Sequence, residues 1–281
     1  MPDLPTDKGQ IFGPAERYIG ERVTQSLAAI DPGVISAVLE GLDLPESPEI
    51  LDAGCGSGRN MVTLAALGSV TGIEISDASV ARARDRAVGE VVQASITEMP
   101  LADQRFDLAV CLDVLEHIDN EALALRELRR VMRSSGLLLI TVPAYQSLWS
   151  AHDVINHHKR RYNRRTLCDV AIAAGWEPVW VSYFNALLLP VAAGHRRLAR
   201  LRHALDEPVS DLDQTPDYLN TALETPLRFE AWLIAHGRTI PAGLSLIAVL
   251  RKAAAPAANP PDVTRWRVRQ ERRQLLRRQH R

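Results

Sequence analysis

The chain has 281 residues, of which 46% are hydrophobic and 24% charged, with a formal net charge of −1 at pH 7. This composition is ordinary for a globular protein of one large or two small domains, and the longest apolar runs are too short for a membrane-spanning helix. The three cysteines lie far apart, which excludes a disulfide framework and a cysteine-based zinc site and predicts a cytoplasmic protein.

The first 47 residues are predicted to form a helical extension. Residues 1–10 contain no apolar core, which argues against a signal peptide. One helix is expected from Pro14, with this proline in its first turn, and a second from Asp31 to Leu42.

From residue 48 onward, short apolar strands alternate with helices. We expect helices over residues 59–67, 77–87, 120–132 and 165–175, the last one ended by Gly175. We expect strands over residues 49–53, 70–75, 90–94, 106–112, 136–142, 177–184 and 244–252. Strands joined by helical crossovers predict a doubly wound α/β fold with a mostly parallel sheet.

This α/β domain is expected to span residues 48–252. Two insertions, at about 143–165 and 186–240, are expected on its substrate side. Residues 253–281 read as a linker rich in proline and alanine, followed by an arginine-rich tail.

The stretch ILDAGCGSGRNM, residues 50–61, predicts a ligand-binding turn. Asp52 ends an apolar strand, and three glycines follow at every second position, Gly54, Gly56 and Gly58. Glycines before a helix allow a ligand to approach the backbone closely. No Gly-Lys-Ser/Thr follows, which excludes a P-loop, and Arg59 occupies the third position of the dinucleotide fingerprint.

The motif LDAGCGSG resembles the first motif of the class I S-adenosylmethionine-dependent methyltransferases. Glu74 ends the next strand, where these enzymes carry an acid that binds both ribose hydroxyls. The resemblance covers roughly residues 48–184 and the late strand, and it implies a Rossmann-like, seven-stranded sheet. The strand over 244–252 would then lie beside 177–184 as an antiparallel edge hairpin, with added helices around the sheet.

The resemblance also implies which residues bind S-adenosylmethionine. Ser95 stands where many relatives have an aspartate for the adenine amino group, and its hydroxyl can accept the same hydrogen bond. Ile96 would pack on the ring. The complete expected set is Asp52, Ala53, Gly54, Gly56, Gly58, Glu74, Ile75, Ser95, Ile96, Cys111, Leu112 and Asp113.

Candidate catalytic and acceptor-binding residues lie after two later strands. The block LEHI supplies His117, which has a purely structural alternative role. Residues 142–167 contain an H-D-x4-H-x-R-R-Y pattern that resembles a subgroup of these methyltransferases. We expect catalytic residues among His117, His152, Asp153 and His158, and acceptor-binding residues among Tyr145, Trp149, Arg160, Arg161 and Tyr162.

Two alternatives apply to the residues of this pattern. A loop held together by aspartate–arginine pairs and stacked aromatic rings would need no chemistry. The histidines and the aspartate do not have the spacing of a standard zinc site, so no metal is predicted. If the segment instead binds the acceptor, its arginines suit an anionic group on that acceptor.

The C-terminal third suggests contact with a surface. Residues 186–205 form an amphipathic pattern that either covers the domain or lies on a membrane. Residues 265–281 contain eight arginines and one glutamate, a net charge of +7. This charge favours a solvated tail, and the alternative is attraction to anionic lipid. This tail has a single aromatic residue, Trp266, which disfavours nucleic-acid binding.

Taken together, the motifs predict methyl transfer from S-adenosylmethionine to a small-molecule or lipid-like acceptor, at oxygen, by in-line displacement. The chain lacks the N/D-P-P-Y/F motif of many amino-group methyltransferases, which disfavours nitrogen. The alternatives are a nicotinamide-dependent oxidoreductase and a non-catalytic cofactor-binding or scaffold protein.

Overall fold

Seven strands form one sheet in the order β3-β2-β1-β4-β5-β7-β6 in the computed structural model, which describes residues 32–190, 194 and 229–253. The strands are β1 (Glu49–Ala53), β2 (Ser69–Glu74), β3 (Glu90–Gln93), β4 (Phe106–Leu112), β5 (Met132–Pro143), β6 (Trp176–Phe184) and β7 (Ser245–Lys252). Five neighbouring strands from β3 to β5 are parallel, as predicted.

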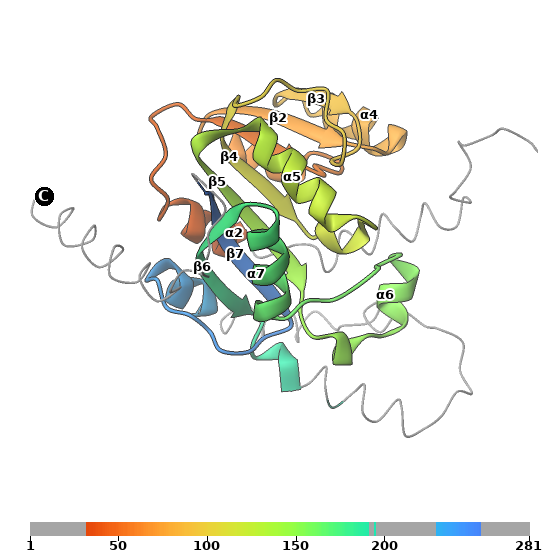
Figure 1. Ribbon diagram of the computed structural model, residues 1–281, viewed down its shortest axis with the longest axis vertical. Coiled ribbons are helices and arrows are strands. Elements are labelled where there is room, and N and C mark those ends of the chain that lie inside the picture. Colours follow the sequence, from red (N-terminus) through yellow and green to blue (C-terminus); the bar gives the residue numbers. More distant parts are fainter. Residues whose placement is uncertain (1–31, 191–193, 195–228, 254–281) are drawn as a thin grey trace, which may run out of the picture.

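The last strand confirms the expected edge hairpin. β7 inserts between β5 and β6 and runs antiparallel to both (Figure 1). Residues 246–250 are fully apolar and buried, as an inner strand covered on both faces requires. The fold is therefore the expected doubly wound α/β fold with a seven-stranded, mostly parallel sheet.

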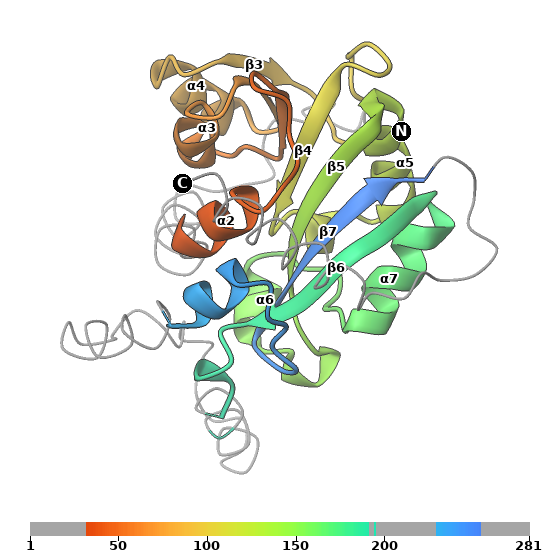
Figure 2. The ribbon, with the colours of Figure 1, turned by 90° about the vertical axis from the view of Figure 1, so that its left-hand side faces the viewer.

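Helices cover both faces of the sheet, as Figure 2 shows from the side. On one face, α2 (Pro32–Leu39), α3 (Arg59–Leu64), α4 (Asp77–Asp85) and the helical residues 229–235 pack into one core cluster. On the other face, α5 (Glu121–Val131) and α7 (Arg164–Ala173) pack into a second cluster. The sheet is thus buried between two helical layers, which explains its long apolar strands.

Local signals set several helix ends. The side chain of Asn120 accepts a hydrogen bond from Leu123 N at 3.1 Å and begins α5. Gly175, with φ +86°, follows α7 in the left-handed conformation, which confirms its predicted role. Several boundaries differ from the prediction, and α2, for example, ends at Leu39 instead of Leu42. Helix α3 ends three residues early, at Leu64, and β5 begins at Met132, because that residue pairs with Phe106 across a register shift.

Three short elements follow the carboxyl ends of β4 and β5. They are η1 (Leu115–His117), η2 (Gln146–Leu148) and α6 (Ala151–Ile155), the last two within the predicted polar insertion. The expected helix from Pro14, most of 186–205 and the tail after residue 253 lie outside the described residues. Within the described part of the chain, no helix has the length and apolar character needed to cross a bilayer.

Candidate functional site

The glycine turn lies where the strand order reverses, between β1 and β4. In open α/β sheets, ligands bind outside the carboxyl ends of the strands at this point. Gly54, Gly56 and Gly58 all have positive φ, at +83°, +52° and +78°. Only glycine adopts such a run without strain, so the alternating pattern follows from the backbone path.

The three glycines have different neighbours. A Cβ atom added to Gly54 would lie 2.5 Å from Cγ2 of Val114, and one added to Gly58 would lie 3.1 Å from Ala83. At Gly56, a Cβ atom would meet nothing within 4 Å. Protein packing therefore explains Gly54 and Gly58, whereas Gly56 leaves one side of the turn open, as the approach of a ligand to the backbone requires.

Glu74 connects this turn to the end of β2. Its Oε2 atom accepts a hydrogen bond from Gly56 N at 3.0 Å, and its Oε1 atom accepts bonds from Ile75 N and Ser76 N at 2.9 Å each. These bonds hold the carboxylate beside the open glycine. An acceptor-only group here fits the ribose diol implied by the family resemblance. The side chain of Ile75 is 68% exposed and offers an apolar surface at the same strand end.

Asp52 provides the strongest indication that the crevice binds a cationic group. Asp52 is only 1% exposed, and among the described residues its Oδ2 atom has no hydrogen-bond partner. Burial, and secondly the charge of Glu74, raise its pKa to about 7. A buried carboxylate oxygen without a donor is costly, and the amino group of S-adenosylmethionine carries the missing charge and donors. The residues of the turn therefore fit this cofactor.

The other expected cofactor residues line the same strand ends or the core beneath them. Ala53 and Cys111 are fully buried, while Leu112 is partly buried. The Oγ atom of Ser95 lies 2.7 Å from Thr97 Oγ1, and Ile96 is 5% exposed within the core. Contacts of Ser95 and Ile96 with an adenine ring stay a prediction.

Asp113 follows β4 with a positive φ of 52°. Its N–H donates to the carbonyl of Thr141, and its Oδ1 accepts from the Thr141 hydroxyl, each over 3.1 Å. Burial raises the pKa of Asp113, opposed by the bond from Thr141 and the charge of His158. The acid is thereby fixed between the glycine turn and the first predicted insertion, residues 143–165.

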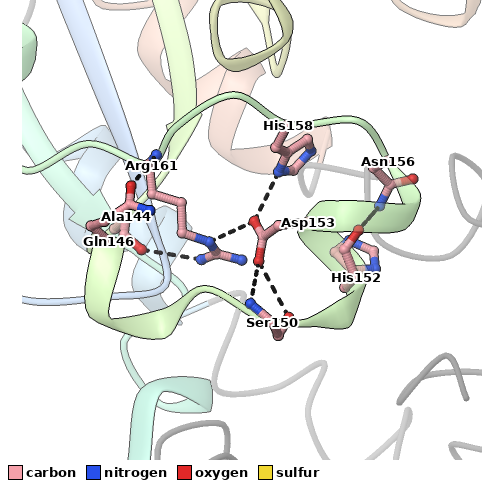
Figure 3. Close-up of polar contacts among 8 residues, drawn as sticks. All are labelled: Ala144, Gln146, Ser150, His152, Asp153, Asn156, His158 and Arg161. Carbon is pink, nitrogen blue, oxygen red and sulfur yellow. Dashed lines mark hydrogen bonds and ion pairs between the residues drawn. The ribbon is translucent and has the colours of Figure 1, made fainter. Parts of the chain in front are cut away.

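A second polar cluster surrounds Asp153 on α6 (Figure 3). Its Oδ1 atom accepts hydrogen bonds from Arg161 Nε at 2.6 Å and from His158 Nδ1 at 2.9 Å. Its Oδ2 atom accepts a bond from Ser150 N at 2.8 Å. Although its complete burial acts most strongly in the opposite direction, the bonds from His158 and Arg161 hold the pKa of Asp153 below its usual range. Asp153 is thus an ionised residue that positions His158.

Both predicted acceptor-binding arginines have protein partners. Arg161 also donates to Ala144 O at 3.1 Å and is nearly buried. Arg160 pairs with Glu121 at 2.8 Å and donates to Asp119 O at 2.9 Å. The hydroxyl of Tyr162, which is 2% exposed, donates to Glu121. These contacts favour the alternative in which ion pairs hold the loop together; binding of an anionic acceptor stays a prediction.

The two other predicted acceptor residues are aromatic. Tyr145 stacks on Tyr183, with ring centroids 5.2 Å apart, and burial followed by the hydrogen bond with Tyr183 raises its pKa to about 12. Trp149 is partly buried next to η2. Neither is a proton acceptor near neutral pH, so their expected role is restricted to packing against an acceptor.

The predicted catalytic histidines gather around His158. The His117 and His152 rings lie edge-on to it, with centroids 4.7 Å and 6.2 Å away. His152 also contacts Asn156 Nδ2 through Nε2 at 3.0 Å. Desolvation, and secondly the charge of His158, lower the pKa of His117 to about 4, although water offsets part of this shift because the residue is exposed.

Glu116 is the residue that sequence reasoning missed. It is 1% exposed, and among the described residues its Oε2 atom lacks a partner. Burial, and secondly the charge of Asp113, raise its pKa well above the usual range. The LEHI block contained this residue, but only tertiary structure shows that its carboxyl group is enclosed.

The glycine turn and the histidine cluster adjoin. Burial, followed by the charges of Glu116, Asp52 and Asp113, raises the pKa of Cys111. The Cys111 thiol on β4 is therefore close enough to be affected by Asp52 of the glycine turn and by Glu116 of the histidine cluster. The two groups of acids therefore lie around the carboxyl end of β4.

Comparison with known proteins gives a consistent result. Residues 51–140 match a methyltransferase domain. The chain is 30% identical over 208 residues to Rv3030 of Mycobacterium tuberculosis, named as a probable S-adenosylmethionine-dependent methyltransferase, covering 72% of this chain and 76% of that one. It is 35% identical over 119 residues to the ubiquinone biosynthesis O-methyltransferase of Alkalilimnicola ehrlichii, covering 40% and 48%.

A solved structure supports the same fold. The S-adenosylmethionine-dependent methyltransferase of Mesorhizobium loti aligns with a TM-score of 0.52 at 16% identity, over 78% of this chain and 97% of that one. At this identity, the similarity concerns the arrangement of strands and helices.

Proposed function

The chain belongs to the class I S-adenosylmethionine-dependent methyltransferases, and we propose that it methylates a hydroxyl oxygen of a small-molecule or lipid-like acceptor. Membership of this family excludes the two alternatives, a nicotinamide oxidoreductase and a non-catalytic protein. It also makes S-adenosylmethionine the cofactor of this chain. The acceptor and the methylated atom are the proposed parts.

The turn after β1 would hold the cofactor through three groups. Gly56 would approach it with bare backbone, Glu74 would accept bonds from its ribose, and Asp52 would pair with its amino group. When bound, S-adenosylmethionine supplies a methyl group on a sulfonium that an aligned nucleophile displaces in line. The chain itself therefore has mainly to orient the acceptor and prepare its nucleophilic atom.

The hydrogen bond between His158 and Asp153 carries the proposal of oxygen as the nucleophile. A hydroxyl is a weak nucleophile until it loses its proton, so an oxygen-methylating site benefits from groups that promote this loss. His158, oriented by Asp153 and flanked by His117, lies after the carboxyl end of β5. The relative named as an O-methyltransferase points in the same direction.

An exposed apolar surface supports a lipid-like acceptor. Leu187, Phe229 and Trp232 are each more than half exposed, at 51%, 57% and 52%. They line one pocket with Ile240, and the Phe229 and Trp232 rings stack 5.7 Å apart. Exposed apolar groups gathered in this way typically bind apolar ligands or membranes. Ala186 and Leu187, at the start of the stretch 186–205 for which membrane contact is expected, belong to this pocket.

The test is transfer of a labelled methyl group into extracts of small molecules and lipids, followed by mass spectrometry of the product. We expect an O-methyl ether or ester. An N- or C-methylated product would contradict oxygen as the acceptor atom, and a purely polar product of low mass would contradict the lipid-like acceptor.

A further inference from the structure

Three potential metal ligands converge from two separate segments of the chain. Glu116 and His117 belong to η1 after β4, whereas His158 lies beyond α6. One ligand-capable atom of each lies within 4.8 Å of the other two. His158 lies more than 40 positions after Glu116 and His117 in the sequence. Sequence spacing therefore did not predict that the three side chains form a group.

The Oε2 atom of Glu116 has no hydrogen-bond partner within the part of the chain that the structure describes. With 1% of the residue exposed, water does not readily replace that partner. A buried unpartnered carboxylate oxygen is rare in proteins unless it serves a ligand or an ion. This observation is independent of the convergence of the histidines.

Each histidine has an acceptor for one ring nitrogen. His158 Nδ1 bonds Asp153 Oδ1 at 2.9 Å, and the ring of His117 bonds the backbone of Asn156. Metal-ligating histidines nearly always donate the second ring N–H to a carboxylate or a backbone carbonyl. For His158, this bond directs Nε2 away from Asp153 as the atom that can bind a cation.

The local charge also favours a cation. Three carboxylates, from Asp113, Glu116 and Asp153, act electrostatically on this group, and Arg161 is the buried cation among them. Lys159 is exposed and pairs with Asp119 at 3.3 Å. These carboxyl groups outnumber the buried cation, so they can offset the charge of a bound metal once they are ionised.

We propose that Glu116, His117 and His158 bind one divalent transition-metal ion that activates the acceptor oxygen. Two imidazoles and one carboxylate suit ions such as zinc or cobalt, whereas magnesium and calcium prefer oxygen ligands. Three protein ligands leave coordination positions for an acceptor oxygen, and the exposure of His117 gives the ion a route of entry. A hydroxyl bound to such an ion releases its proton to solvent more readily.

This inference rests on the proposed oxygen methylation for its chemical purpose, but the site can be tested without an acceptor. Cobalt(II) is titrated into the full-length, metal-stripped protein while its visible absorption is followed. We expect one equivalent of four- or five-coordinate cobalt, displaced by zinc and not by magnesium. Glu116→Gln and His158→Ala should each weaken cobalt binding at least tenfold.

Asp153→Asn should weaken it about 10- to 100-fold, because this residue orients His158. His236→Ala, an exposed histidine at the end of the helix over 229–235, is the matched control and should bind cobalt like the unaltered protein. Titration with S-adenosylhomocysteine reports whether each variant is folded. Absent cobalt binding, or equal binding by His158→Ala and His236→Ala, would overturn the site. A failure to form an O-methylated product would leave the cobalt result unchanged and would instead contradict the proposed function.

Discussion

The backbone N–H of Gly56 donates a hydrogen bond to Glu74 Oε2 over 3.0 Å, which joins the turn after β1 to the end of β2. The bond fixes a partly exposed carboxylate beside the open backbone at Gly56. Two of the three glycines are required by packing, and this one is not. Substitutions at Gly56 and Glu74 should therefore distinguish effects on cofactor binding from effects on folding.

Replacing Glu74 by alanine should weaken binding of S-adenosylhomocysteine by about 1.5–3 kcal/mol, the range for charge-assisted hydrogen bonds. Calorimetric titration measures this loss, and NAD should give no heat with either protein. Glu98→Ala, an exposed glutamate in the loop before β4, should bind normally. Unchanged affinity in Glu74→Ala would place the ribose elsewhere.

Alanine at Gly56 should mainly weaken cofactor binding, whereas alanine at Gly54 should mainly reduce stability. Gly56→Ala should cost about 1–2 kcal/mol of stability, from left-handed backbone strain, yet reduce cofactor affinity at least tenfold. Gly54→Ala should destabilise far more, since its Cβ atom would lie 2.5 Å from Val114. Thermal unfolding with and without S-adenosylhomocysteine compares them. Normal cofactor binding by Gly56→Ala would rule out close approach at this position.

Asp52→Asn should stabilise the cofactor-free protein above neutral pH. Because the pKa of Asp52 rises from 3.8 to about 7 on folding, the folded state binds the proton more tightly, and stability falls as pH rises from about 4 to 7. Three pKa units correspond to up to about 4 kcal/mol. Denaturant unfolding should give the native protein a smaller free energy of unfolding at pH 8 than at pH 5. This difference should be absent in Asp52→Asn.

The same substitution should weaken cofactor binding, because a neutral amide cannot pair with an ammonium group. In the native protein, affinity for S-adenosylhomocysteine should fall as pH drops from 8 to 6 and Asp52 takes up a proton. Asp52→Asn should bind weakly at both pH values. A steep pH dependence in the variant would assign the titration to another group.

Arg161→Ala should damage acceptor methylation while sparing cofactor affinity. It leaves the fully buried Asp153 without its closest cation, and breaking such a pair costs about 3–5 kcal/mol. Arg165→Ala should be nearly neutral, because the Arg165 side chain is 89% exposed. Melting temperature, turnover and S-adenosylhomocysteine binding are compared. Equal losses of cofactor binding and methylation would favour a purely structural loop.

Phe229→Ser combined with Trp232→Ser should reduce binding to anionic phospholipid vesicles in a sedimentation assay. Both side chains are more than half exposed and lie on the pocket with Leu187. Leu123→Ser, which alters an exposed leucine on α5, should bind vesicles like the native protein. Equal sedimentation of all three proteins would contradict membrane contact through this surface.

The sheet and the family could be predicted from the sequence, because both depend on local patterns. The same patterns predicted the glycine turn as the cofactor site. Strand and helix periodicity gave the α/β alternation, and the spacing of Gly54, Gly56 and Gly58 reflects a backbone path that few other residues follow. Glu74 could be placed beside that turn because parallel strands end at a common edge.

The partners of the polar residues after β5 are visible only in the tertiary structure. The pattern around Arg160, Arg161 and Tyr162 looked like a binding surface, yet their groups bond Glu121, Asp153 and backbone carbonyls. Glu116 and His158, far apart in sequence, meet because η1 and the segment after α6 fold over neighbouring strand ends. Burial and partner choice depend on such long-range contacts, and these energies have no signature in local spacing.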